Sequence, residues 1–120
     1  MLFRSGSNAT GALGYVDCAR ELLNQTRTDH DFELTDVIHA SSSAGTQAGL
    51  LAGFAAIDRQ AGVRVHGINV SEPDSSTLHR SVSDIAGKVL EAHQPEIRLD
   101  PQALRIDSRF LGDEIGRAHV

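Results

Sequence analysis

The residues whose types and spacing most clearly suggest a binding or catalytic site lie in one short stretch, residues 37–50. There a β-branched run gives way to serines, glycines and a threonine. A strand followed by a tight turn of small residues and then a helix points several unpaired backbone N–H groups at one place. The helix dipole adds about half a positive charge there. Serine and threonine hydroxyls supply further donors, so this stretch predicts a site that binds a phosphate group.

The stretch lacks the patterns of the best-known phosphate loops. It does not end in the Gly-Lys-Ser or Gly-Lys-Thr of a P-loop, and it does not contain the G-x-G-x-x-G of dinucleotide-binding proteins. A serine-rich connection in which Thr46 caps a helix is an equally good interpretation of the pattern. The pattern alone therefore leaves both interpretations open.

The elements that must position this stretch alternate along the chain. Helical spacing of apolar residues predicts three helices, at residues 12 to about 24–26, 46–58, and 75 or 77 to 92. Three segments have the composition of strands, at residues 36–40, 63–70 and 104–107, and the first is predicted to be buried. Strands separated by helices predict a parallel sheet in a layered α/β domain.

The second predicted helix has an unusual face, with Gly45, Gly49 and Gly53 at every fourth position. Each interior glycine costs a helix about 1 kcal/mol relative to alanine. Three glycines in register therefore predict that this face packs closely against the sheet or against another stretch of backbone.

Composition excludes several classes of protein. A net charge of −5, dispersed Lys and Arg, and only 4% aromatic residues argue against a nucleic-acid surface. No segment approaches the roughly 20 apolar residues that cross a bilayer, and no signal-peptide pattern is present. The single cysteine, Cys18, fits a reducing compartment. We therefore expect one α/β domain in the cytoplasm, with no nucleic-acid or membrane partner.

Other reactive residue types form weaker patterns. The six histidines show no H-x-x-x-H pair and no cysteine partner at ligand spacing, so no metal site is predicted. No G-x-S-x-G motif marks a serine nucleophile, and Cys18 beside Asp17 is interpreted as an inert, partly buried thiol. Asp29, Asp31, Glu33 and Asp36 are interpreted as a solvated acidic connection.

Two separated motifs resemble those of one family of pyridoxal-phosphate (PLP) enzymes. The family contains the D-cysteine desulfhydrases and the 1-aminocyclopropane-1-carboxylate (ACC) deaminases. Ser-Ala-Gly-Thr-Gln-Ala-Gly-Leu at residues 43–50 resembles its phosphate loop, and residues 6–8 with 11–16 resemble a second motif upstream. Residues 65–71 resemble its next strand, and residues 110–112 the start of a later Gly-Tyr-Gly segment. The resemblance covers nearly all of residues 6–113.

The resemblance implies a fold and a cofactor site. The family has the tryptophan-synthase-β-like fold (fold type II), in which PLP lies between two α/β domains. We therefore expect a three-layer, parallel-sheet fragment of that fold. Ser43, Ala44, Gly45 and Thr46 would hold the PLP phosphate, mainly through backbone N–H groups. The same resemblance places Asn8 and Tyr15, which belong to the upstream motif, near the site.

The resemblance also implies a reaction for the intact enzyme, which would be a homodimer. It would release ammonia and a keto acid from a small amino acid, with sulfide as well if the substrate is D-cysteine. Ser-Ala-Gly-Thr favours the desulfhydrase, whereas Thr-Gln-Ala-Gly and Gly-Phe-Ala-Ala, at residues 53–56, favour the deaminase. The family's Schiff-base lysine would precede Gly6, and the single lysine here, Lys88, falls on the polar side of its helix. No catalytic residue is therefore assigned, and the chain alone is expected to be inactive.

The two ends fit poorly with the segments beside them. Leu-Phe-Arg-Ser at residues 2–5 and Ile-Gly-Arg-Ala-His-Val at residues 115–120 match translations of common sequencing-adapter ends. We therefore expect residues 6–114 to be a partial PLP-binding α/β domain, and residues 1–5 and 115–120 to be non-native. Two other classes stay open: a non-catalytic module that binds a phosphate-bearing ligand at residues 43–46, and a purely structural α/β domain.

Overall fold

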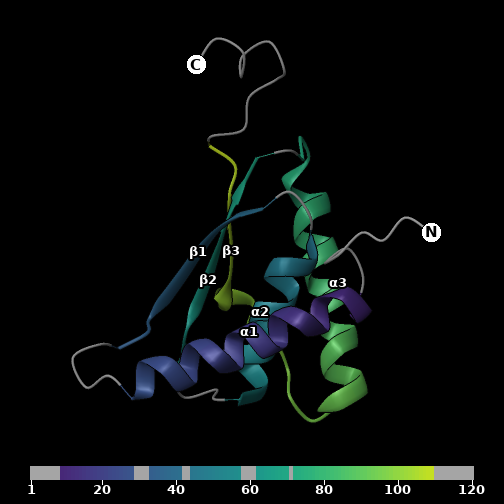
Figure 1. Ribbon diagram of the computed structural model, residues 1–120. Helices are drawn as coiled ribbons and strands as arrows, with labels where there is room; N and C mark the ends of the chain where they lie inside the picture. The colour runs from purple at the N-terminus through teal and green to yellow at the C-terminus, as the bar shows by residue number, and fades with distance from the viewer. Residues whose placement is uncertain (1–8, 29–32, 42–43, 58–61, 71, 110–120) are drawn as a thin grey trace.

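Three parallel strands form the sheet of the computed structural model, in the order β1-β2-β3 (Figure 1). The structure describes residues 9–28, 33–41, 44–57, 62–70 and 72–109. Its elements are α1 (Ala9–Arg27), β1 (Asp36–Ser41), α2 (Ala44–Ile57), β2 (Arg64–Asn69), α3 (Ser75–His93), the 3-10 helix η2 (Pro101–Ala103) and β3 (Leu104–Asp107). The predicted alternation and parallel pairing are confirmed. The suspected non-native ends lie outside the described residues.

The three α-helices lie on one side of the sheet (Figure 1). Strand order follows chain order, and right-handed crossovers between neighbouring parallel strands then place each connecting helix on the same side. α2 contacts β1 and β2, and both α1 and α3 pack against α2. Within the described ranges no helix covers the opposite face of the sheet, so the third layer of the expected arrangement is not seen there.

α2 is the most enclosed element of the structure, with ten of its 14 residues buried. Its glycines let α1 approach closely. A Cβ built on Gly49 would overlap the carbonyl oxygen of Ala12 and lie 2.6 Å from the Tyr15 Cβ, and a Cβ on Gly53 would lie 2.7 Å from the Ala19 Cβ. The predicted close packing is confirmed for Gly49 and Gly53, and the partner is α1, which contributes both backbone atoms and the Cβ atoms of Tyr15 and Ala19.

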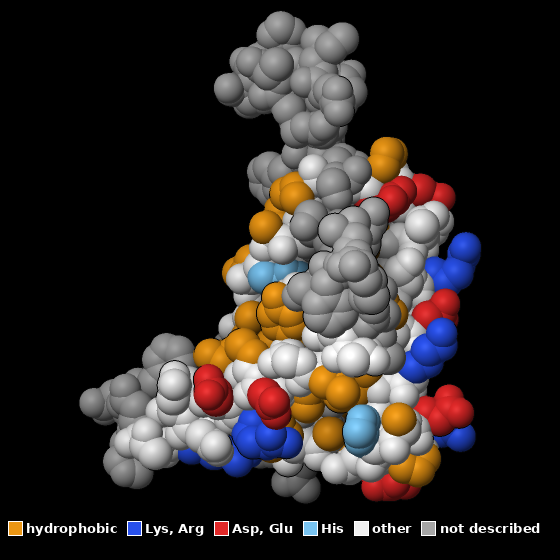
Figure 2. Space-filling view, turned by 45° about the vertical axis from the view of Figure 1, so that its right-hand side comes forward, with side chains coloured by type: hydrophobic (Ala, Val, Ile, Leu, Met, Phe, Trp, Pro, Cys, Tyr) orange, Lys and Arg blue, Asp and Glu red, His pale blue; other side chains and the backbone are white. Residues whose placement is uncertain are grey.

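α3 carries an apolar stripe toward the core and charges on its outer face. Asp74 caps its first turn by accepting hydrogen bonds from the N–H groups of Ser76 and Thr77. Hydrogen bonds from the hydroxyls of Ser76 and Thr77, and then from their N–H groups, lower the pKa of the Asp74 carboxyl. Alternating charges run down one edge of the molecule in Figure 2; the exposed charged residues of α3 include Arg80, Asp84, Lys88 and Glu91. Lys88 is thus exposed, as predicted, and no described helix is both long and apolar enough to cross a bilayer.

The prediction that β1 is a buried strand is wrong. Ile38 is 70% exposed and Ala40 is exposed, because alternate residues of a strand point to opposite faces and the helices cover one face. Ser41, on the helix-covered face, is 1% exposed. A continuous apolar run predicts burial on both faces, whereas in the described structure β1 is an edge strand with one open face.

The close α1–α2 contact gives a first prediction. Gly49→Ala should lower the free energy of unfolding by about 1–3 kcal/mol, because the added methyl overpacks the contact with Ala12. Gly14→Ala is the matched control, because nothing lies within 4 Å of a Cβ built there. This control should raise the free energy of unfolding by up to about 1 kcal/mol through helix propensity. Urea denaturation measures both, and equal effects would contradict the close contact.

Candidate functional site

The three strands end at one edge of the sheet, and α2 begins there. β1 ends at Ser41, β2 at Asn69 and β3 at Asp107, and α2 starts at Ala44. We call this part of the molecule the carboxyl edge. In open parallel sheets, ligands bind outside the carboxyl ends of the strands, so the carboxyl edge is the candidate site.

The first turn of α2 brings the described members of the predicted phosphate loop together. Ala44 and Gly45 are buried and Thr46 is half-buried, and the first N–H groups of a helix have no partner within the helix. The first turn contains no acidic residue that would repel an anion. Ser43 and Asn8 lie outside the described residues. Tyr15 lies on α1, with its Cβ against Gly49, one turn along α2 from Gly45.

Three buried polar atoms near this edge have no hydrogen-bond partner in the part of the chain that the structure describes. They are His39 Nε2, Ser41 Oγ and Gln47 Oε1. An unpaired buried polar group costs about 1–3 kcal/mol, and such groups are uncommon in native proteins. Ser41 is a hydroxyl donor at the end of β1, just before the connection to α2. A buried hydroxyl without a partner is expected at a binding site where the ligand supplies the hydrogen-bond acceptor.

His39 lies on the helix-covered face of β1, two residues before Ser41. Its Nδ1 is 3.1 Å from the carbonyl oxygen of Ala40. Because a carbonyl can only accept, a hydrogen bond at this distance requires the tautomer with the proton on Nδ1, which leaves Nε2 as an acceptor. Burial lowers the pKa of His39.

Asn69 holds the carboxyl edge together. Its fully buried side chain donates to the Glu72 carbonyl oxygen at 2.8 Å and to Ser108 Oγ at 3.0 Å, and accepts from the Glu72 N–H at 3.0 Å. One amide therefore joins the loop after β2 to the segment after β3. Asn69 was not among the predicted site residues, although its place at the end of a predicted strand is a signal that could have identified it.

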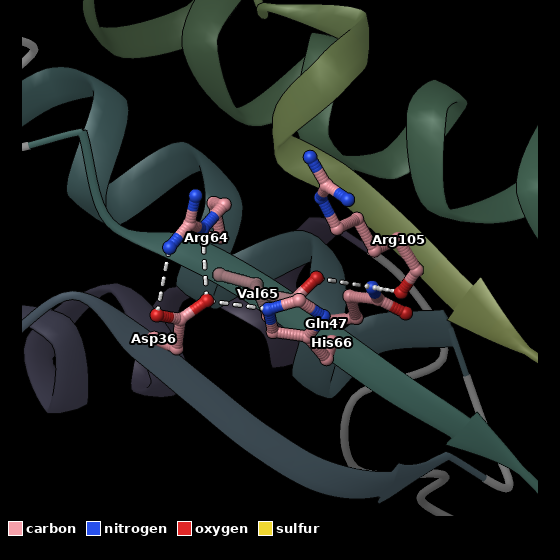
Figure 3. Close-up of polar contacts among 6 residues, drawn as sticks. All are labelled: Asp36, Gln47, Arg64, Val65, His66 and Arg105. Atoms are coloured by element: carbon pink, nitrogen blue, oxygen red, sulfur yellow. Dashed lines mark hydrogen bonds and ion pairs between the residues drawn. The ribbon is translucent and has the colours of Figure 1, made fainter.

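Gln47 ties the first turn of α2 to the sheet (Figure 3). Its fully buried side chain donates through Nε2 to the carbonyl oxygens of Val65, at 3.2 Å, and Arg105, at 2.8 Å. Its Oε1 occupies the space that a side chain at Gly67 would fill. The sequence alone places Gln47 only within the loop motif at residues 43–50 and does not predict this contact with the sheet.

A second polar cluster lies at the amino ends of the strands and consists of Asp36, Arg64 and His66 (Figure 3). Arg64 donates through Nε and Nη2 to the two Asp36 oxygens, at 2.8 and 3.0 Å, and His66 Nε2 lies 2.6 Å from Oδ1. Hydrogen bonds from Arg64, and then from His66, hold the pKa of Asp36 well below its usual range. In the same pair, Asp36 raises the pKa of Arg64.

This cluster corrects the interpretation of Asp36 as part of a solvated acidic connection. Asp36 belongs to β1 and lies directly opposite Arg64 of β2. The pairing depends on strand register, which brings together residues 28 positions apart and which the sequence pattern does not give. No group of three or more histidine, cysteine, aspartate or glutamate side chains is gathered among the residues described.

The depressed pKa of Asp36 gives a prediction about acid stability. A carboxyl whose pKa is lower in the folded state stabilises that state fully above its unfolded pKa, about 4, and less as pH falls below it. Asp36→Asn should therefore lower Tm at pH 7 and flatten the fall of Tm between about pH 4 and pH 2. Asp84→Asn, at an exposed carboxylate of α3, is the control. Melting curves of the two variants that fall in parallel with acid would contradict this role.

Comparison with known proteins identifies relatives of this chain. No family model matches the chain. It is 42% identical to a D-cysteine desulfhydrase of Klebsiella pneumoniae (strain 342) over 89 residues, which are 74% of this chain and 24% of that protein. It is 34% identical to a 1-aminocyclopropane-1-carboxylate deaminase of Burkholderia ambifaria (strain MC40-6) over 106 residues, 88% of this chain and 30% of that protein.

The chain thus spans 24% and 30% of the lengths of these two curated relatives. The matched residues cover most of the chain, and the parallel sheet agrees with the fold that the motifs predicted. Over the segment that it spans, the chain belongs to the family of the D-cysteine desulfhydrases and ACC deaminases.

Proposed function

We propose that residues 6–114 are part of a PLP-dependent enzyme of this family, and that the carboxyl edge binds the PLP phosphate. The observation that carries the proposal is the N-terminus of α2, free of acidic residues in its first turn. Beside it lies the Ser41 hydroxyl, buried and without a partner among the described residues. Both features favour an anion at this place.

The residues present fit a phosphate. Ala44, Gly45 and Thr46 would hold it through backbone N–H groups, together with Ser43, and the Ser41 hydroxyl would supply a further donor. Small side chains let a phosphate approach the backbone. PLP, when bound, supplies an electron sink for the α-carbon of an amino acid. We keep Asn8 and Tyr15 as residues near the site, Tyr15 because it flanks α2 at Gly49.

For the intact enzyme we propose a D-cysteine desulfhydrase activity, in which D-cysteine and water give a keto acid, ammonia and hydrogen sulfide. ACC deaminase is the second candidate, because the Burkholderia ACC deaminase matches 88% of the chain. In that reaction ACC and water would give a keto acid and ammonia. We assign no catalytic residue to this chain, since Lys88 is exposed in the second half of α3, which leads away from the carboxyl edge.

We further propose that the rest of the polypeptide covers the open face of the sheet. Ile38 and Ala40 are exposed there, and parallel sheets are found almost only with both faces covered. The chain spans at most 30% of the curated relatives cited here, so the intact protein has ample length for a third layer and a second domain. We expect that protein to be a cytoplasmic homodimer, as the family resemblance implies.

The phosphate site can be tested on the chain itself by calorimetry with pyridoxal 5'-phosphate and with pyridoxal, which lacks the phosphate. The unmodified chain should bind the phosphorylated compound more tightly by about tenfold, the contribution of one hydrogen bond to a charged group. Thr46→Glu should remove this preference, because its carboxylate would repel the phosphate. The substitution should keep the fold, because an acid in the first turn stabilises a helix by about 0.3–1 kcal/mol.

Thr46→Gln is the matched neutral control and should retain the preference. Binding that is equal for the two compounds in the unmodified chain would reject the phosphate site and favour the purely structural domain. Tight binding of unrelated sugar phosphates or nucleotides would instead favour the non-catalytic module.

The activity is tested by comparing two proteins with the same residues 6–114. The 120-residue chain with PLP should release no measurable ammonia or sulfide from D-cysteine or ACC, because it has no lysine at the proposed site. The polypeptide encoded by the complete gene should release a keto acid from one of them. Turnover by the short chain would contradict the assignment of the catalytic lysine to another part of the enzyme.

A further inference from the structure

Gln47 combines three properties that a helix residue in contact with a sheet rarely needs together. It is fully buried, both of its donor hydrogens are used by carbonyl oxygens of two strands, and its Oε1 has no partner among the described residues. The neighbours of Gln47 in the first turn are the residues proposed to hold the phosphate. Gln47 is thus the polar link between that turn and the middle of the sheet (Figure 3).

The position of the amide is set by a glycine in the sheet. A Cβ at Gly67 would collide with Gln47 Oε1 and lie 3.0 Å from its Cδ and 3.3 Å from its Nε2. Gly67 lies between His39 of β1 and Ile106 of β3 in the strand register. Because residue 67 has no side chain, there is space between the helix and the sheet for the side-chain amide of Gln47.

An apolar side chain of similar size could fill this space, but it would not fix the helix along the strands. Dispersion contacts are weak individually and tolerate small displacements. Two hydrogen bonds to carbonyls on different strands fix both the height and the register of the first turn, since their strength falls steeply with distortion. The carbonyl oxygens can accept them in addition to a ladder bond, because each has two lone pairs.

We propose that Gln47 is a positioning residue for phosphate binding. Its amide, which packs against Gly67, fixes the position of the first N–H groups of α2 at the carboxyl edge. The inference rests on the proposed function and adds a residue that touches no ligand. The proposal predicts that substitutions at Gln47 or Gly67 weaken phosphate binding by more than their effect on the stability of the fold explains.

The test uses variants at both positions of the 120-residue chain and two readouts. The readouts are Tm and the ratio of affinities for pyridoxal 5'-phosphate and pyridoxal. Gly67→Ala should lower Tm and reduce the ratio by about tenfold, the equivalent of one lost hydrogen bond to a charged group. Gln47→Met, which is similar in length but has no donor, should reduce the ratio to the same extent. Gly87→Ala, where an added Cβ meets nothing within 4 Å, should leave the ratio unchanged.

The double variant Gln47→Ala/Gly67→Ala separates positioning from packing. The methyl added at residue 67 fills part of the space left by the amide, so Tm should recover above that of Gly67→Ala. The affinity ratio should stay low, because α2 no longer has its tie to the strand carbonyls. A ratio that recovers together with Tm would overturn the inference and leave Gln47 a packing role.

Failure of the proposed function gives a different result. If the unmodified chain itself shows no preference for the phosphorylated compound, the phosphate site is rejected, and the positioning role falls with it. If the unmodified chain and Gly87→Ala show the preference and Gln47→Met retains it in full, only the inference about Gln47 is overturned.

Discussion

The burial of α2 is the constraint from which most of this structure follows. Ten of its 14 residues are buried, with α1, α3 and the sheet around it. A helix packed on several sides has little room for long side chains, and Gly49 and Gly53 meet this condition by admitting α1 to backbone contact. The glycines lower the intrinsic stability of the helix, so α2 depends on tertiary packing for its conformation.

This enclosure also explains the polar groups at the carboxyl edge. Since α2 lies against the sheet, its N-terminal N–H groups and the end of β1 meet at one place. Gln47, Asn69 and Ser41 are fully or almost fully buried there. Gln47 and Asn69 use their amides to hold neighbouring segments in fixed positions, whereas the Ser41 hydroxyl remains without a partner in the described part of the chain. These hydrogen bonds hold in advance the segments around the place where we propose that the phosphate binds.

The face of the sheet that the three α-helices leave open carries both charged and apolar side chains. Asp36, Arg64 and His66 form a cross-strand cluster at its amino end, and exposed Ile38 and Ala40 follow along β1. This is the face on which we propose that the rest of the intact enzyme packs.

The sequence by itself determined the three α-helices, the three strands and their order, because helical and strand periodicities depend on local spacing along the chain. It also identified the residue run at the α2 N-terminus, the close-packed glycine face and the exposed position of Lys88. Only the tertiary structure decided which face of β1 is open, that Asp36 meets Arg64, and that the Gln47 amide fits over Gly67. These depend on strand register and on which layers are present, and they join residues from 20 to 58 positions apart. No local pattern encodes such pairings, because the contact exists only once the crossovers have placed the strands side by side.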